Sequence, residues 1–238
     1  MAGGLLRYGR MTLYKPPKSR VLRFAYENSL MIAMAVFIIS TIIAQAVAGW
    51  HVYNEELEDL GRAPLSIGEY LTSGHFLEAT FENWESEFLQ MGMFVLLAVW
   101  LRQWGSAESK KLYQKEDVDR EPDPRRKDAP WPVKKGGWIL WLYSRSLAIA
   151  FFSLFVLSTF LHARGGAEVE SIERMSKGEE PIGTLAYMGT SRFWFESMQN
   201  WQSEFVSIIA IVAFTIFLRQ KGSPQSKPVD EGHDETGT

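Results

Sequence analysis

The chain of 238 residues contains no cysteine, which excludes disulfide bonds, cysteine-ligated metals and thiol catalysis. It also has no glycine-rich phosphate loop, no serine–histidine–aspartate arrangement and no zinc-protease pattern. Its Lys and Arg residues are dispersed, so nucleic-acid binding has no support. The sequence therefore predicts no catalytic residue, no cofactor and no nucleic-acid partner, and it leaves open whether the protein is an enzyme.

Long uncharged stretches are the main feature that is present. Residues 29–48 form a run of 20 residues without a charge, which as a helix is about 30 Å long and matches a bilayer core. Residues 146–163 form a second run, and residues 88–101 and 205–218 are shorter runs that follow Glu87 and Glu204. The sequence predicts four transmembrane spans, at about 29–48, 85–102, 145–163 and 202–219.

The second half of the chain repeats the first at a constant spacing of 117 residues. Residues 83–88 read Asn-Trp-Glu-Ser-Glu-Phe, and residues 200–205 read Asn-Trp-Gln-Ser-Glu-Phe. Each copy has two spans, so both copies insert in the same orientation, related by a pseudo-twofold axis along the membrane normal. The predicted fold is all-α, a membrane four-helix bundle built from two tandem two-span repeats.

The distribution of positive charge predicts the topology. The segments 1–27, 102–145 and 219–238 hold 20 of the 25 Lys and Arg residues, whereas the segments 49–87 and 164–204 hold 5. By the positive-inside rule, both termini are cytoplasmic and the two acidic connections face outward.

Composition divides the chain further. Residues 111–137 are polar and proline-rich and cannot bury enough apolar surface to offset the entropy of ordering, which predicts a flexible linker. Ser66 and Glu69 have the spacing of a capping box, which predicts a short outer helix. The predicted parts are a cytoplasmic N-terminal segment (1–25), repeat 1 (26–110), the linker (111–137), repeat 2 (138–223) and a disordered cytoplasmic tail (224–238).

Glu87 and Glu204 occupy the same place in both copies, in the outer part of a span. An acidic residue at the centre of a span costs about 2.5–3.5 kcal/mol and less near its ends, so each should be paired, protonated or facing water. One interpretation makes them proton- or cation-binding groups near the pseudo-twofold axis, together with Asn83 and Asn200. The other, which we favour, makes them helix N-terminal residues that pair with a cation: Arg164, Arg192 or His51.

A second acidic set exists only in the first copy. His75, Glu78, Glu82 and Glu85 share a helix face of about 80° and could converge on one divalent metal ion. Their counterparts in the second copy are Arg192, Phe195, Gln199 and Gln202. We favour a solvated acidic face over a metal site. His162, which stands where the first copy has Gln45, is predicted to form a hydrogen bond between helices.

Residues 72–90 read TSGHFLEATFENWESEFLQ. This motif closely resembles the signature of a family of bacterial integral membrane proteins described only as a domain of unknown function. The resemblance covers about 26–110 and 143–223, and the second copy departs from the motif at the four positions named above. It implies a bacterial membrane protein and nothing about activity.

These observations favour a structural or interaction role in the bacterial cytoplasmic membrane. The expected partners are the lipid bilayer and either a second copy of the chain or another membrane protein. The alternative is a small-ion or proton pathway that uses Glu87 and Glu204. A metal-dependent enzyme at the second acidic set is a more distant alternative.

Overall fold

The computed structural model describes residues 19–237, and every regular element in that range is a helix. Three helices are long and apolar enough to cross a membrane: α2 (Ser29–Asp59), α7 (Ser146–Ser176) and α9 (Ser191–Phe217). The remaining predicted span, at about 85–102, overlaps α4 (Gly74–Leu97). This helix carries four glutamates and is not among the three apolar helices. Most of the predicted N-terminal segment lies outside the described residues.

The chain divides into two compact units, Met1–Val52 and Tyr53–Thr238. The described part of the first unit holds α1 (Arg20–Glu27) and the beginning of α2. Between the two helices, the Asn28 side chain donates to the Phe24 carbonyl at 2.8 Å. The first uncharged run therefore begins together with α2, at Ser29.

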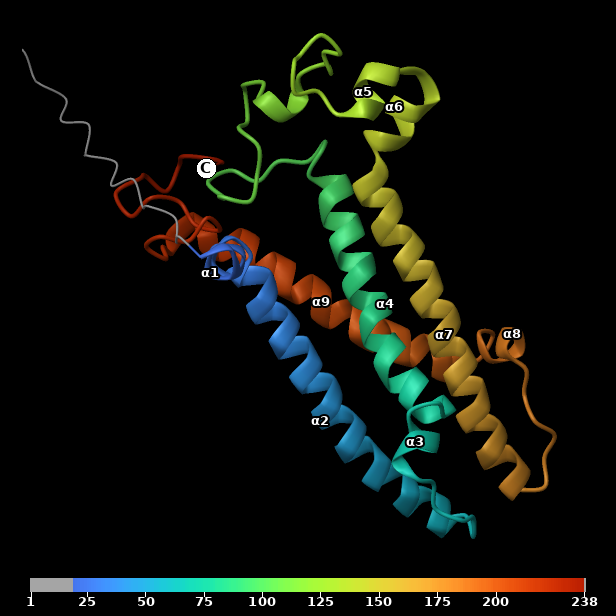
Figure 1. Cartoon of the computed structure of the whole chain (residues 1–238). Helices are drawn as coiled ribbons and strands as arrows, with labels where there is room; N and C mark the ends of the chain where they lie inside the picture. Colours follow the sequence, from blue (N-terminus) through green and yellow to red (C-terminus); the bar gives the residue numbers. More distant parts are fainter. Residues whose placement is uncertain (1–18, 238) are drawn as a thin grey trace, which may run out of the picture. The chain divides into compact units, whose positions relative to one another are not determined.

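In the second unit, α4 and α7 pack side by side in opposite directions, and α9 crosses α4 at an angle (Figure 1). Glycines set the spacing of α4 and α7. A Cβ atom at Gly165 would lie 2.5 Å from both the Glu78 nitrogen and the Gly74 oxygen, and one at Gly92 would lie 3.3 Å from Phe151 Cβ. Such small residues let the backbones of membrane helices approach closely.

Two short helices precede α4 and α9. The first, α3 (Ile67–Tyr70), begins with a complete capping box between Ser66 and Glu69, as the sequence predicts. The second, α8 (Thr184–Tyr187), lies in the equivalent connection. The Asn54 side chain bonds both backbone groups of Leu65 in the first connection, and the Ser171 hydroxyl does the same for Ile182 in the second.

Polar residues fill much of the interior of the second unit, and apolar residues cover its outside. Glu85, Ser86 and His162 are buried, whereas Val206 is 63% exposed and Ile209 67% exposed. Water as solvent would favour the opposite arrangement, because apolar surface is expelled from water. Exposed apolar side chains on long helices suit a lipid environment.

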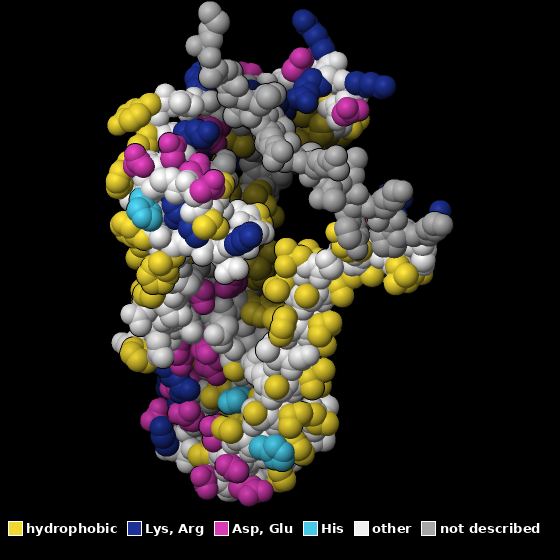
Figure 2. All heavy atoms as spheres, turned by 90° about the vertical axis from the view of Figure 1, so that its left-hand side faces the viewer, with side chains coloured by type: hydrophobic (Ala, Val, Ile, Leu, Met, Phe, Trp, Pro, Cys, Tyr) yellow, Lys and Arg dark blue, Asp and Glu magenta, His cyan; other side chains and the backbone are white. Residues whose placement is uncertain are grey.

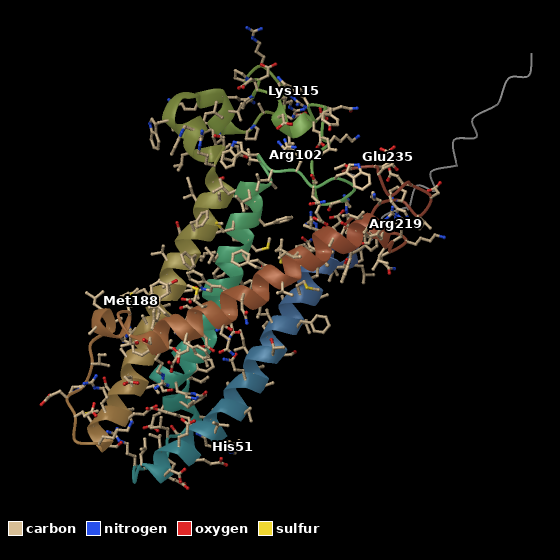
Figure 3. The ribbon with its side chains drawn as sticks, turned by 180° about the vertical axis from the view of Figure 1, so that it is seen from behind. His51, Arg102, Lys115, Met188, Arg219 and Glu235 are labelled. Atoms are coloured by element: carbon tan, nitrogen blue, oxygen red, sulfur yellow. The ribbon has the colours of Figure 1, made fainter. Side chains whose placement is uncertain are left out.

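The linker predicted at 111–137 contains two short helices, η1 (Asp117–Asp119) and α5 (Trp131–Lys135), and α6 (Gly137–Tyr143) follows them. The tail is also held in place. The Lys227 ammonium is buried and donates to the Gly105 and Glu235 carbonyls at 2.7 and 2.8 Å. Figure 3 labels Glu235 and also Arg219, which donates to the Glu231 carbonyl at 3.0 Å. The composition of 224–238, from which a disordered tail is predicted, does not reveal these acceptors.

Candidate functional site

Ionisable side chains from four helices meet inside the second unit, and we call this group the buried acidic cluster. On α4, Glu78, Glu82 and Glu85 are spaced by four and three residues, which places them on one helix face. The antiparallel packing of α7 and the crossing of α9 bring further groups to this face. The cluster comprises Glu78, Glu82 and Glu85 of α4, His162 of α7, Tyr187 of α8, and Arg192 and Glu196 of α9.

His162 lies at the centre of the cluster and is fully buried. Its Nδ1 atom is 3.3 Å from Glu85 Oε2, and its Nε2 atom is 3.5 Å from Glu196 Oε2. Neither contact has hydrogen-bond geometry, and both ring nitrogens lack a hydrogen-bond partner within the described residues. His162 thus lies between helices, as the sequence predicts, and faces a carboxylate on each side.

Tyr187 joins two of the carboxylates. Its hydroxyl lies 2.8 Å from Glu196 Oε2 and 3.2 Å from Glu78 Oε1. Burial raises the pKa of the Tyr187 phenol, so its hydroxyl keeps its proton and acts as a donor. One hydroxyl proton serves only one acceptor at a time. Tyr187 therefore leaves one of the two carboxylates available for another proton or a cation.

Arg192 is the main positive group at the mouth of the cluster. It pairs with Glu170 at 3.0 Å, with Glu173 at 3.1 Å and with Glu196 at 3.1 Å. The surroundings of Arg192 and His162 thus hold more carboxylates than cationic groups. Figure 3 shows many oxygen and nitrogen atoms around the beginning of α9, beside α7 and α4. Such an excess of negative charge favours the binding of a cation.

A cavity of about 280 Å³ leads to this cluster. Glu78, Glu82, Glu196 and Arg192 line it, while Glu85 and His162 are fully buried. Figure 2 shows acidic side chains gathered at the end of the second unit where α4 begins and α7 ends. The cavity is therefore lined mainly by acidic side chains.

The structure separates the four residues that the sequence suggests as a metal site. Glu78 and Glu82 line the cavity, and Glu85 is buried beside His162. His75 lies in the cavity wall, but its Nδ1 atom is 3.0 Å from the Tyr70 hydroxyl and its ring stacks on Tyr53. The three glutamates therefore belong to one site, and His75 has another hydrogen-bonding role.

Sequence reasoning missed His162 and Glu196 as members of the cluster. A signal was present in the predicted 117-residue repeat. At this spacing His162 aligns with Gln45, and Glu196 aligns with Ala79. Two ionisable groups thus appear only in the second copy, opposite acids that appear only in the first.

Glu87 and Glu204 lie outside the cavity, but they lie next to each other. Their carboxylates are close enough to interact electrostatically. The Gln90 side chain donates to the Glu204 carbonyl at 2.9 Å and to Ser207 Oγ at 2.8 Å, which fixes α4 against α9 at this point.

Among residues 19–237, neither Glu87 nor Glu204 forms an ion pair with Arg164, Arg192 or His51. Arg192 pairs with the other three glutamates described above. Asn83 and Asn200 donate to carbonyls of their own helices, those of Ala79 and Glu196, at 2.9 and 3.1 Å. These two bonds lie within a helix, so the asparagines do not use these amide protons to join neighbouring helices.

Comparison with known proteins places the chain in a family without assigning an activity. No curated protein and no solved structure matches it. The motif at 72–90 leads to the expectation of an uncharacterised domain family, and the comparison confirms it. The family model described as "Domain of unknown function (DUF6766)" matches residues 21–238, and the chain therefore belongs to this family.

Proposed function

We propose that the protein is a four-span protein of the bacterial cytoplasmic membrane that binds and conducts a small cation through the buried acidic cluster. The three long apolar helices support the membrane location. We take α4 as the fourth span because its buried Glu85 contacts His162 of α7 and Trp201 of α9, which shield this carboxylate from lipid. The motif at 72–90 supports the bacterial origin.

The bounds of the helices support a tandem duplication. α2 and α7 begin and end 117 residues apart, as do α3 and α8. α4 and α9 begin 117 residues apart, and beyond their ends Arg102 and Arg219 each cap three carbonyls at equivalent positions. Gln90 and its counterpart Ser207 touch each other, as residues beside a pseudo-twofold axis should.

One observation carries the cation proposal: His162 is fully buried between carboxylates of two different helices. Ionisable groups are expensive inside a membrane protein and by default mark a functional pathway. A purely structural role would need only neutral hydrogen bonds, such as the one between Gln90 and Ser207. Glu87 and Glu204 are the next acidic residues along α4 and α9, so they extend the pathway.

Flux measurements on His162→Gln test this function. The substitution introduces the residue that the first copy has at Gln45. We expect vesicles containing the parent protein to dissipate an imposed gradient of protons or divalent cations, followed with dyes inside the vesicles. The variant should be at least about tenfold slower, since a positioned proton-transfer group typically contributes roughly 10²–10⁴-fold to a rate.

Glu58→Gln is the matched control, because Glu58 is an exposed acidic residue outside the cluster. It should conduct like the parent. The conduction proposal fails if the parent vesicles leak no faster than empty ones, or if a folded His162→Gln protein conducts like the parent.

The orientation gives a separate prediction. Reporter fusions after Lys110 and after Lys227 should be cytoplasmic, and a reporter inserted near Gly61 should lie outside, because the basic segments stay in the cytoplasm. Periplasmic and cytoplasmic reporter activities in the same strains provide the measurement. A cytoplasmic signal at Gly61 would contradict the outward-facing acidic connection.

A further inference from the structure

We infer that Glu78, His162 and Glu196 form a binding site for a first-row divalent transition-metal ion. The inference rests on the proposed function and deepens it by naming the class of cation. One ligand atom from each of the three side chains lies within 4.8 Å of the other two. The three residues come from α4, α7 and α9, so a bound ion would join three helices.

The surroundings of His162 favour metal binding at Nε2. A histidine binds a metal ion through one ring nitrogen. The other ring nitrogen usually donates to a carboxylate, a backbone carbonyl or a water, which fixes the tautomer and the ring orientation. Here Glu85 Oε2 lies 3.3 Å from Nδ1, and it has no hydrogen-bond partner within the described part of the chain. Trp201 donates to the other Glu85 oxygen at 3.3 Å. Glu85 is therefore placed to orient His162, and Nε2 is directed toward Glu196.

The carboxylates are also held in place. Arg192 binds Glu196 Oε1 at 3.1 Å, so the other oxygen, Oε2, is the one that faces Nε2 at 3.5 Å. Tyr187 touches Glu78 and Glu196, which keeps both near the imidazole. Zinc binds nitrogen and oxygen ligands at about 2.0–2.2 Å, so its ligand atoms lie at most about 4.4 Å apart. Small rotations of the two carboxylates would close the observed separation.

The ligand types decide the class of ion. One imidazole and two carboxylates suit Zn²⁺, Mn²⁺ or Fe²⁺, whereas Ca²⁺ and Mg²⁺ prefer ligand sets made only of oxygen. The chain has no cysteine, so thiolates cannot compete for the ion. Two carboxylates also neutralise a divalent charge, which lowers the cost of burying the ion.

Metal titration of the full-length protein in detergent tests the site. The protein is stripped with a chelator and titrated with Zn²⁺ and Mn²⁺ by calorimetry, with Mg²⁺ for comparison. We expect one Zn²⁺ or Mn²⁺ per chain and much weaker Mg²⁺ binding. His162→Gln should weaken Zn²⁺ binding by more than about 100-fold, and Glu85→Gln by about 10- to 100-fold, the usual effect of removing a carboxylate that orients a ligand.

His75→Ala is the control, because His75 lies in the same cavity wall but bonds to Tyr70. It should bind Zn²⁺ as the parent does. X-ray absorption of the Zn²⁺-loaded parent should show imidazole scattering. This measurement needs no variant, so it remains informative if His162→Gln does not fold. A parent that binds no ion, or whose spectrum lacks imidazole, overturns the metal site.

The two proposals fail in different ways. Loss of flux in His162→Gln, with no stoichiometric metal in the parent, would reject the metal site and keep the cation pathway. A stoichiometric metal that depends on His162, in a protein that conducts nothing, would keep the metal site and reject the pathway.

Discussion

Gly165→Ala should destabilise the protein by about 3 kcal/mol, near the upper end of the usual cost of overpacking. The new Cβ atom would lie 2.5 Å from the Glu78 nitrogen and from the Gly74 oxygen. Both are backbone atoms of α4, so no side chain can rotate to relieve the contact. The two helices must separate, and the acidic cluster that depends on their spacing separates with them. Thermal unfolding in detergent, followed by near-UV circular dichroism, provides the measurement.

Two further glycine variants sharpen this test. Gly74→Ala fills the same crossing from the other helix, since its Cβ atom would lie 2.7 Å from the Gly165 oxygen. The double variant should therefore cost less than the sum of the two single variants, because the helices separate only once. Gly68→Ala should change stability little, because a Cβ atom there meets nothing within 4 Å. Parental stability of Gly165→Ala would show that α4 and α7 do not approach this closely.

Arg192→Gln should have the second largest effect on stability, a loss of about 2–3 kcal/mol at neutral pH. The substitution removes one guanidinium from three carboxylates, those of Glu170, Glu173 and Glu196. Hydrogen bonds to charged groups contribute about 1.5–3 kcal/mol, and the carboxylates left behind repel one another. Arg192 is 37% exposed at its side chain, so solvent screening keeps the loss below that of a fully buried pair.

The pH dependence distinguishes this explanation from a packing defect. Protonated carboxylates neither repel one another nor need a cation, so the stability difference between variant and parent should shrink as the pH falls. Arg174→Gln is the control, because Arg174 forms an ion pair with Glu179 at 3.5 Å near the surface. Its loss should stay within about 0.5 kcal/mol. A stability difference for Arg192→Gln that does not change with pH would contradict the electrostatic explanation.

Local sequence signals predicted the helical elements well. The capping box at Ser66 and Glu69 depends on interactions within a few residues. The face shared by Glu78, Glu82 and Glu85 also follows from one helix alone, because residues three and four apart lie on the same side. These features could be read from the sequence because they involve no distant part of the chain.

The membership of the site depended on contacts between helices. His75 has the right spacing to join the three glutamates of α4, yet it bonds to Tyr70. His162 reaches these glutamates from α7, although it lies 77 positions beyond Glu85 in the sequence. The close approach at Gly165 and the crossing angle of α9 decide which side chains meet, and neither is encoded by helical periodicity. The sequence by itself determined the helices, their charged faces and the 117-residue spacing. Only the tertiary structure decided that His162 lies between Glu85 and Glu196, because helix packing fixes distances between residues that are remote in the chain.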